Sequence, residues 1–206
     1  MWFNRRQRTD NKTLFRNCGK QRKKMDIKET LIEQLKTTVN LLNKHEIGYA
    51  LAGGLAFSAL VEPRATMDID LLLMIKEEEL PGFFKVLEKK VELLVPHNEP
   101  MRFNLIKIWR VVSFTNNLEI IIDFLIAESK FHKSVVKRAI EIDFFKTKLK
   151  IITLEDLILL KICAKRTQDI ADLEQIYSTF KNEIDHDYVE RWAGKLNIKL
   201  ASFMKI

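Results

Sequence analysis

An apolar run with two acids near its start is the feature that most restricts how this chain can fold. The run MDIDLLLMI, residues 67–75, has the length and composition of a buried β-strand. Side chains alternate along a strand, so Asp68 and Asp70 share one face while Ile69 points to the other. Two carboxylates so near to each other repel, and beside Leu71–Leu73 they are poorly hydrated. A bound divalent cation would remove that cost, although the pair could also be solvent-facing acids.

A second apolar run, LEIIIDFLIA at 118–127, contains a single acid, Asp123. An acid in the middle of an apolar strand is costly unless it is paired or binds a metal. If this strand lies beside the first, Asp123 completes a three-carboxylate cluster. It would then be the candidate general base, or a ligand of a second metal. The alternative is a carboxylate bonded to an Arg or Lys within the fold.

A pair of glycines, Gly53 and Gly54, ends the strand-like segment YALAGG at 49–54. A short helix is expected directly afterwards, at 55–61. Glycines let the backbone approach a phosphate closely, and a helix N-terminus adds free N–H groups and a positive dipole. The pattern therefore indicates a phosphate-binding turn, although paired glycines often only make a turn.

The remaining periodicity predicts an α/β (α+β) fold, with a mixed-sheet core flanked by helices and a helical C-terminal part. Asp26 and Thr153 are the N-caps expected for the first and the fifth helix. We divide the chain into a basic tail (1–24), a core (25–152) and a helical part (153–206). The expected helices are 26–45, 55–61, 80–92, 130–141, 154–166, 168–181 and 185–196, and the expected strands are 49–54, 67–75, 104–114, 118–127 and 146–152.

A lone cation, Lys161, interrupts LEDLILLKICA, which is apolar on nearly all sides. A Lys in such a helix is expected to extend to solvent or to face a cleft. We therefore take Lys161 as a candidate phosphate contact.

Basic residues are concentrated at the N-terminus. Residues 1–24 hold nine Lys and Arg against one Asp, a charge of +8, whereas the whole chain carries +7. The rest of the chain is therefore close to neutral. The tail could hold RNA phosphates, could be a solvated arm, or could precede a true start at Met25.

The sequence does not favour a membrane protein, a zinc-binding protein or a disulfide-stabilised protein. No apolar run approaches the roughly 20 residues of a membrane span, so we expect no membrane partner and a cytoplasmic location. Cys18 and Cys163 form no Cys-x-x-Cys pair, and the four histidines are scattered without ligand spacing.

In combination, these motifs resemble the pattern of the nucleotidyltransferase superfamily. The pattern is a hydrophobic-Gly-Gly motif followed, after thirteen residues, by Asp-Ile-Asp-Leu. Within that superfamily, the AbiEii-type toxin and minimal nucleotidyltransferase-like branch often has an Arg-x-Thr/Ser motif just before the acids. Arg64 and Thr66 resemble that motif. The segment TLEDLILLKICAKRTQDIADLEQI is also similar to the helical part of this branch, which has a Lys, an Arg/Lys-rich turn and then Asp-x-x-Asp. Here these residues are Lys161, Arg166, Asp169 and Asp172.

The resemblance implies transfer of a nucleoside monophosphate from an NTP, dependent on Mg²⁺ (or Mn²⁺). It implies a catalytic and metal-binding set and a nucleotide-binding set. The first is Asp68, Asp70 and Asp123, and the second is Gly53, Gly54, Arg64, Thr66, Lys161 and Asp172. Leu55 departs from the pattern, because many relatives have a hydroxyl residue directly after the two glycines.

Three functions are compatible with these residues. The leading hypothesis is an enzyme that modifies RNA, plausibly tRNA, as the toxin of a toxin–antitoxin or phage-defence pair, with a cognate antitoxin protein as partner. The second is the same chemistry on a small molecule such as an antibiotic. The third is a non-catalytic module that binds a nucleotide or a protein partner.

Overall fold

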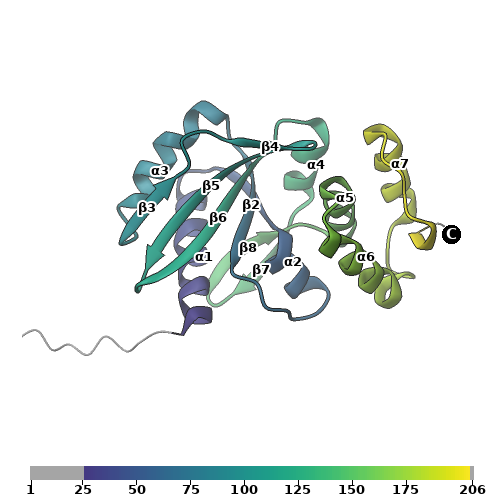
Figure 1. Ribbon diagram of the computed structural model, residues 1–206, viewed down its shortest axis with the longest axis horizontal. Coiled ribbons are helices and arrows are strands. Elements are labelled where there is room, and N and C mark those ends of the chain that lie inside the picture. Colours follow the sequence, from purple (N-terminus) through teal and green to yellow (C-terminus); the bar gives the residue numbers. More distant parts are fainter. Residues whose placement is uncertain (1–25, 205–206) are drawn as a thin grey trace, which may run out of the picture.

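A single mixed sheet forms the centre of the molecule in the computed structural model, which describes residues 26–204. The sheet has eight strands in the order β3-β5-β6-β2-β1-β8-β7, and β4 also pairs with β5 (Figure 1). The strands are β1 (Gly48–Ala52), β2 (Asp68–Met74), β3 (Leu93–Pro96), β4 (Met101–Phe103), β5 (Ile106–Thr115), β6 (Leu118–Ile126), β7 (Ile140–Phe144) and β8 (Thr147–Ile151). The helices are α1 (Ile27–Lys44), α2 (Gly53–Leu60), α3 (Leu80–Glu88), α4 (Lys130–Arg138), α5 (Leu154–Ala164), α6 (Thr167–Phe180) and α7 (His186–Leu196), with short 3₁₀ helices at Glu77–Glu79 and Ser202–Met204.

Helices α1 and α3 cover one face of the sheet. The ring of Phe83 in α3 packs edge-on against Phe124 of β6, with centroids 5.9 Å apart. Gln34 of α1 accepts hydrogen bonds from Ser113 and Thr115 of β5, at 3.0 and 2.8 Å. Residues of α4 and α5 lie over the opposite face, which carries the acids.

Strand β2 lies in the middle of the sheet, antiparallel to β1 and parallel to β6. Ile69, Leu71 and Leu73 point away from the acidic face and are completely buried in the core. The alternation in MDIDLLLMI therefore places apolar side chains inward and the two acids on the other face, because the side-chain period of a strand is two. The α/β fold class expected from the sequence is confirmed.

Helices α1 and α5 begin at the capping residues expected from the sequence. The backbone N–H of Asp26 donates to the Glu29 carboxylate at 3.4 Å, which completes a capping box at the start of α1. Thr153 caps α5 by accepting the Asp156 N–H at 3.3 Å. Both predicted N-caps are confirmed.

Two parts of the sheet differ from the prediction made from sequence. The short strands β3 and β4 were not predicted, because both are stabilised by pairing with β5 rather than by a pattern of their own. The helix predicted over 130–141 ends at Arg138, because residues 140–144 pair with β8 as strand β7.

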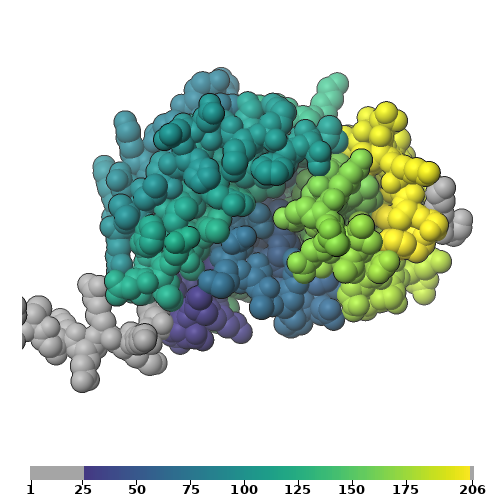
Figure 2. Space-filling model, in the orientation of Figure 1, coloured from purple at the N-terminus to yellow at the C-terminus, as the bar shows by residue number. Residues whose placement is uncertain are grey.

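The C-terminal helices α5, α6 and α7 lie at one end of the sheet, beyond α2 (Figure 1). Figure 2 shows the green surface of α5 and α6 against the blue surface of α2. Helix α5 ends at Lys165, which adopts a left-handed conformation with φ +56° and separates α5 from α6. The basic tail at 1–24 lies outside the described residues. Within 26–204, no helix combines the length and the apolar composition needed to cross a membrane.

Candidate active site

The two glycines form a tight junction between β1 and α2, and each is required by a close neighbour. Gly53 has φ +62°, and a Cβ placed on it would lie 1.9 Å from an Oδ2 atom of Asp70. A Cβ on Gly54 would lie 2.7 Å from the Thr66 hydroxyl and 3.3 Å from an Arg64 nitrogen. The backbone N–H of Gly54 lies near the Asp70 carboxyl and opposes the rise in its pKa. The N-terminus of α2 is therefore in direct contact with the second acid of β2.

The three acids lie on one face of the sheet. Asp68 and Asp70 are two residues apart on β2, and Asp70 is directly opposite Asp123 in the parallel β2–β6 pair. Ala52, just before the glycines, is opposite Asp70 on the other side. The structure therefore brings together the glycine pair and all three acids that the sequence selected.

The pKa values of the acid pair reflect an excess of negative charge. Burial, followed by the charge of Asp123, raises the pKa of Asp70 to about 6. The pKa of Asp68 is raised for the same two reasons. The positive charge of Arg166 opposes the rise at both carboxyls. In the absence of a cation, ionising this face costs the folded protein free energy.

We expect the stability of metal-free protein to fall, relative to Asp70→Asn, as the pH rises from about 4 to about 7. The folded-state pKa of Asp70 lies above its ordinary value of 3.8. The native state therefore binds more protons than the unfolded state within that window, and its free energy of unfolding decreases with pH. At pH 7 the difference should be on the order of 2 kcal/mol in favour of Asn. Urea denaturation in EDTA at several pH values measures it, and a difference that does not change with pH would contradict this assignment.

Asp123 is held by a residue that was not selected from the sequence, Arg110 of β5. Its Nε and Nη2 donate to the two carboxylate oxygens of Asp123 at 2.8 and 2.7 Å. This is the alternative stated for Asp123, a carboxylate bonded to an Arg within the fold. The signal was present in the sequence, because Asn116-Asn117 forms a two-residue turn with positive φ at both positions. Arg110 and Asp123 are equally distant from that turn, so they must be paired across the hairpin.

The residues present fit a divalent cation such as Mg²⁺. Carboxylate oxygens are the ligands that Mg²⁺ prefers, and protein sites commonly supply only one or two of them, with substrate phosphates and water completing the shell. Asp68 and Asp70 meet that requirement, and burial, followed by the charge of Asp123, disfavours the ionised form of Asp70 in the absence of a cation. Within residues 26–204, no three His, Cys, Asp or Glu side chains are arranged to hold a metal by themselves.

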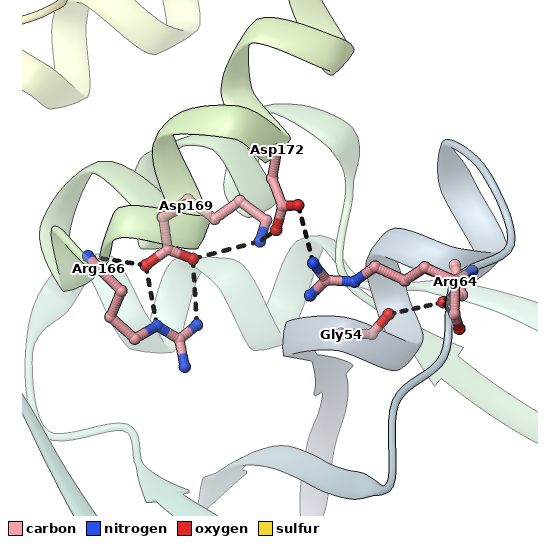
Figure 3. Close-up of polar contacts among 7 residues, drawn as sticks. Gly54, Arg64, Arg166, Asp169 and Asp172 are labelled. Atoms are coloured by element: carbon pink, nitrogen blue, oxygen red, sulfur yellow. Dashed lines mark hydrogen bonds and ion pairs between the residues drawn. The ribbon is translucent and has the colours of Figure 1, made fainter.

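A buried network of charges joins α5, α6 and the loop before β2 (Figure 3). The Lys161 ammonium contacts Asp169 at 3.3 Å and also Asp172, and its side chain is only 3% exposed. Asp169 is bonded in turn to Arg166, at 2.9 and 3.1 Å. Asp172 accepts from Arg64 at 2.8 Å. Every carboxylate in the network has two cationic partners, and one positive charge is left over.

We expect Lys161→Met to reduce the free energy of unfolding by about 3–5 kcal/mol, since it removes one partner from two buried carboxylates. Lys137→Met is a suitable control, because Lys137 is exposed on α4. The control should change stability by less than about 0.5 kcal/mol. Chemical denaturation of both variants measures the difference. Equal effects would show that the ion pairs of Lys161 do not hold α5 and α6 together.

A cavity of about 280 Å³ opens beside the acids, between the sheet and α5. Its polar end includes Asp70, Asp123, Arg110 and Lys161. His132 also lines it, and burial lowers the pKa of this His to about 4, so the ring is neutral at physiological pH. Most of the other lining side chains are apolar, among them Phe103, Leu105, Ile106, Leu125, Leu157 and Leu160.

Phe103 and Leu105, on either side of Asn104 in the β4–β5 turn, line this cavity. The Asn104 side-chain amide donates to the carbonyl oxygens of Cys163 and Ala164, both at 3.1 Å. These are the last carbonyls of α5, which have no partner within the helix. The contact ties the hairpin to the C-terminal helices.

The sequence matches a described protein family. A family model described as "Nucleotidyltransferase of unknown function (DUF6036)" matches residues 29–202. Among curated proteins, none matches the sequence.

Two solved structures illustrate the similarity of fold. An antigenic nucleotidyltransferase-like protein from Paracoccidioides brasiliensis is 16% identical, with a TM-score of 0.51 over 83% of this chain and 94% of its own. The antibiotic-resistance factor ANT(2'')-Ia is 11% identical, with a TM-score of 0.52 over 82% of this chain and 94% of its own.

Proposed function

Because this chain belongs to the family of nucleotidyltransferases of unknown function (DUF6036), we propose that it is an enzyme that transfers a nucleoside monophosphate from an NTP to an acceptor hydroxyl. One observation carries the proposal: Asp68 and Asp70 lie on one face, with Asp70 against the glycine junction that opens α2. That junction provides carboxylates for a Mg²⁺ or Mn²⁺ ion and backbone N–H groups for phosphate in the same place.

Each residue near the junction has a role that follows from its position. Asp68 and Asp70 would hold the cation, and the N-terminus of α2 at Gly53 and Gly54 would face the phosphates. A divalent cation bound there would neutralise charge on the triphosphate and orient the α-phosphate. Thr66 adjoins Gly54, where its hydroxyl would support the same turn.

In the transfer step, the acceptor oxygen forms a bond to the α-phosphorus, and the bond from that phosphorus to the α–β bridging oxygen breaks. Pyrophosphate leaves with the electron pair of that bond. Asp123 would accept the proton of the acceptor hydroxyl, because it is next to Asp70 in the sheet and lines the cavity. Removing that proton makes the oxygen a better nucleophile.

The charged network contributes from the side of the C-terminal helices. Arg166 lines the cavity, and its charge acts on both Asp68 and Asp70. Lys161 also lines the cavity, and together with Asp172 and Arg64 it would position the helices that close the nucleotide site. The net positive charge of this network is suited to a triphosphate.

RNA, and tRNA in particular, is the acceptor we propose first, with the protein acting in the cytoplasm as a toxin whose partner is a cognate antitoxin. The AbiEii-type resemblance and the charge of +8 in residues 1–24 support it. Purified full-length protein should label total tRNA with one of four α-labelled NTPs. Asp70→Asn should label none. If wild type consumes NTP and leaves tRNA unlabelled, this acceptor is wrong.

The cavity favours a second candidate, a small-molecule acceptor. Its apolar walls and charged floor are typical of sites that enclose a small ligand with a few oriented polar contacts. Incubation with NTP and a panel of hydroxyl-bearing compounds, including lincosamides and aminoglycosides, would detect an NMP adduct by mass spectrometry. NTP binding without transfer to RNA, protein or any compound would instead indicate a non-catalytic nucleotide-binding module.

A further inference from the structure

The ion pair between Arg110 and Asp123 takes up both oxygens of the third acid. The guanidinium approaches edge-on, with Nε and Nη2 2.8 and 2.7 Å from separate carboxylate oxygens. This two-point arrangement is the strongest form of Arg–carboxylate contact. Asp123 is 5% exposed, so few positions remain from which another group could reach its oxygens.

The same carboxylate is the one best placed to join the metal site. Asp123 is the register partner of Asp70 on the neighbouring strand, and both carboxylates line the same cavity. A cation bound at the acid pair would therefore attract Asp123 as well. Two positive partners, the guanidinium and the cation, would compete for one carboxylate.

We propose that Arg110 is a built-in counter-ion that occupies Asp123 in the resting protein and is displaced when a divalent cation binds. Arg110 is then a positioning residue, and it makes the third carboxylate available only in the loaded enzyme. The inference rests on the proposed function for the existence of the cation site. It goes beyond that function because it assigns to Arg110 the control of when Asp123 is available.

The surroundings of Arg110 permit this exchange. Its side chain is 37% exposed and lines the cavity, so a released guanidinium can be hydrated there instead of being buried without a partner. The side chain of Asp123, by contrast, is only 7% exposed, so its charge needs a cation beside it at all times. The partner that moves is therefore the arginine.

Mn²⁺ binding to nucleotide-free protein tests the exchange, with the free ion measured by electron paramagnetic resonance. Four proteins are compared: wild type, Arg110→Met, Asp123→Asn and the double variant. Arg110→Met should bind Mn²⁺ about tenfold more tightly than wild type, because it removes the competitor as well as a positive charge. In the Asp123→Asn background the same substitution should give a clearly smaller gain, since only the charge effect is left.

Equal gains in the two backgrounds would show that Arg110 acts only through its charge, and would overturn the proposal. Unchanged or weaker binding by folded Arg110→Met would overturn it as well. If Arg110→Met does not fold, Arg110→Lys takes its place, because Lys keeps the charge and loses the two-point contact. Arg110→Lys should still bind Mn²⁺ more tightly than wild type, and no tightening would count against the exchange.

A matched control is available in Arg102→Met. Arg102 lies on the neighbouring strand β4 and pairs with Glu128 at 3.1 Å, with both side chains about half exposed. Its removal should leave Mn²⁺ affinity unchanged. Failure of the proposed function would be recognised separately, because wild type would then transfer no nucleotide to RNA, protein or any compound, even with Mn²⁺ present and whether or not it bound NTP.

Discussion

Asp70→Asn is expected to reduce nucleotidyl transfer by about a thousandfold, which corresponds to a loss of roughly 4 kcal/mol of transition-state stabilisation. The substitution keeps the volume of the side chain, so the close approach of residue 70 to Gly53 is retained. It removes the negative charge that would hold the cation, together with one of two carboxylate ligands. The loss should therefore appear in the rate of transfer and in Mn²⁺ affinity, and not in folding.

The combination of lower activity and higher stability identifies a functional charge. At neutral pH the ionised Asp70 is disfavoured by burial and by Asp123, so its neutral replacement should be more stable in EDTA. Each kcal/mol gained should raise the midpoint of thermal unfolding by about 2–4 °C in a protein of this size. A structural carboxylate would show the reverse, with a lower midpoint.

Asp143→Asn is the matched control for this variant. Asp143 lies on the edge strand β7, is 80% exposed and pairs with the exposed Lys148, at 3.0 Å. Exposed ion pairs contribute about 0–1 kcal/mol, so neither activity nor stability should change appreciably. Steady-state transfer rates and thermal unfolding midpoints of the two variants measure these effects on activity and stability. Transfer by Asp70→Asn at more than about a tenth of the wild-type rate would be incompatible with a metal role for Asp70.

The acidic face was predictable from sequence because it depends on local rules. Strand alternation puts Asp68 and Asp70 on one side wherever that strand lies in the sheet. Glycine is required at the start of α2 because Asp70 approaches it closely, and the spacing of the motif alone did not show that approach. That contact joins residues on different strands, so only the β1–β2 pairing reveals it.

Other parts of the site depend on pairing between distant segments. Arg110 could have been identified from the Asn116-Asn117 turn, once the two flanking strands were treated as a hairpin. Lys161 could not have been placed so easily. Its partners belong to α6, and although the sequence predicts a break between the two helices, the angle between them depends on the left-handed residue Lys165. The sequence indicated a cation in an apolar helix, and tertiary packing provided its two carboxylates.

Gly53→Ala is expected to lower the free energy of unfolding by about 3 kcal/mol or more and to abolish transfer. Its φ of +62° costs a Cβ-bearing residue about 1 kcal/mol before any contact is considered. The new methyl group would also lie 1.9 Å from Oδ2, 2.5 Å from Cγ and 2.8 Å from Cβ of Asp70. Rotation of Asp70 could move the first two atoms but not the third, so β1 and β2 must separate locally.

Gly82→Ala separates this effect from the general effect of adding a methyl group to a glycine. Gly82 lies within α3, where an added methyl group would meet no atom within 4 Å, and the variant should gain about 0.5–1 kcal/mol from the higher helix propensity of Ala. Urea denaturation of both variants should therefore show stability changes of opposite sign, and in assays of NMP transfer only Gly53→Ala should lose activity. If Gly53→Ala kept wild-type transfer, the carboxylate of Asp70 would not need its position against the start of α2. The proposed coupling of the cation site to the phosphate site would then be wrong, even with both acids intact.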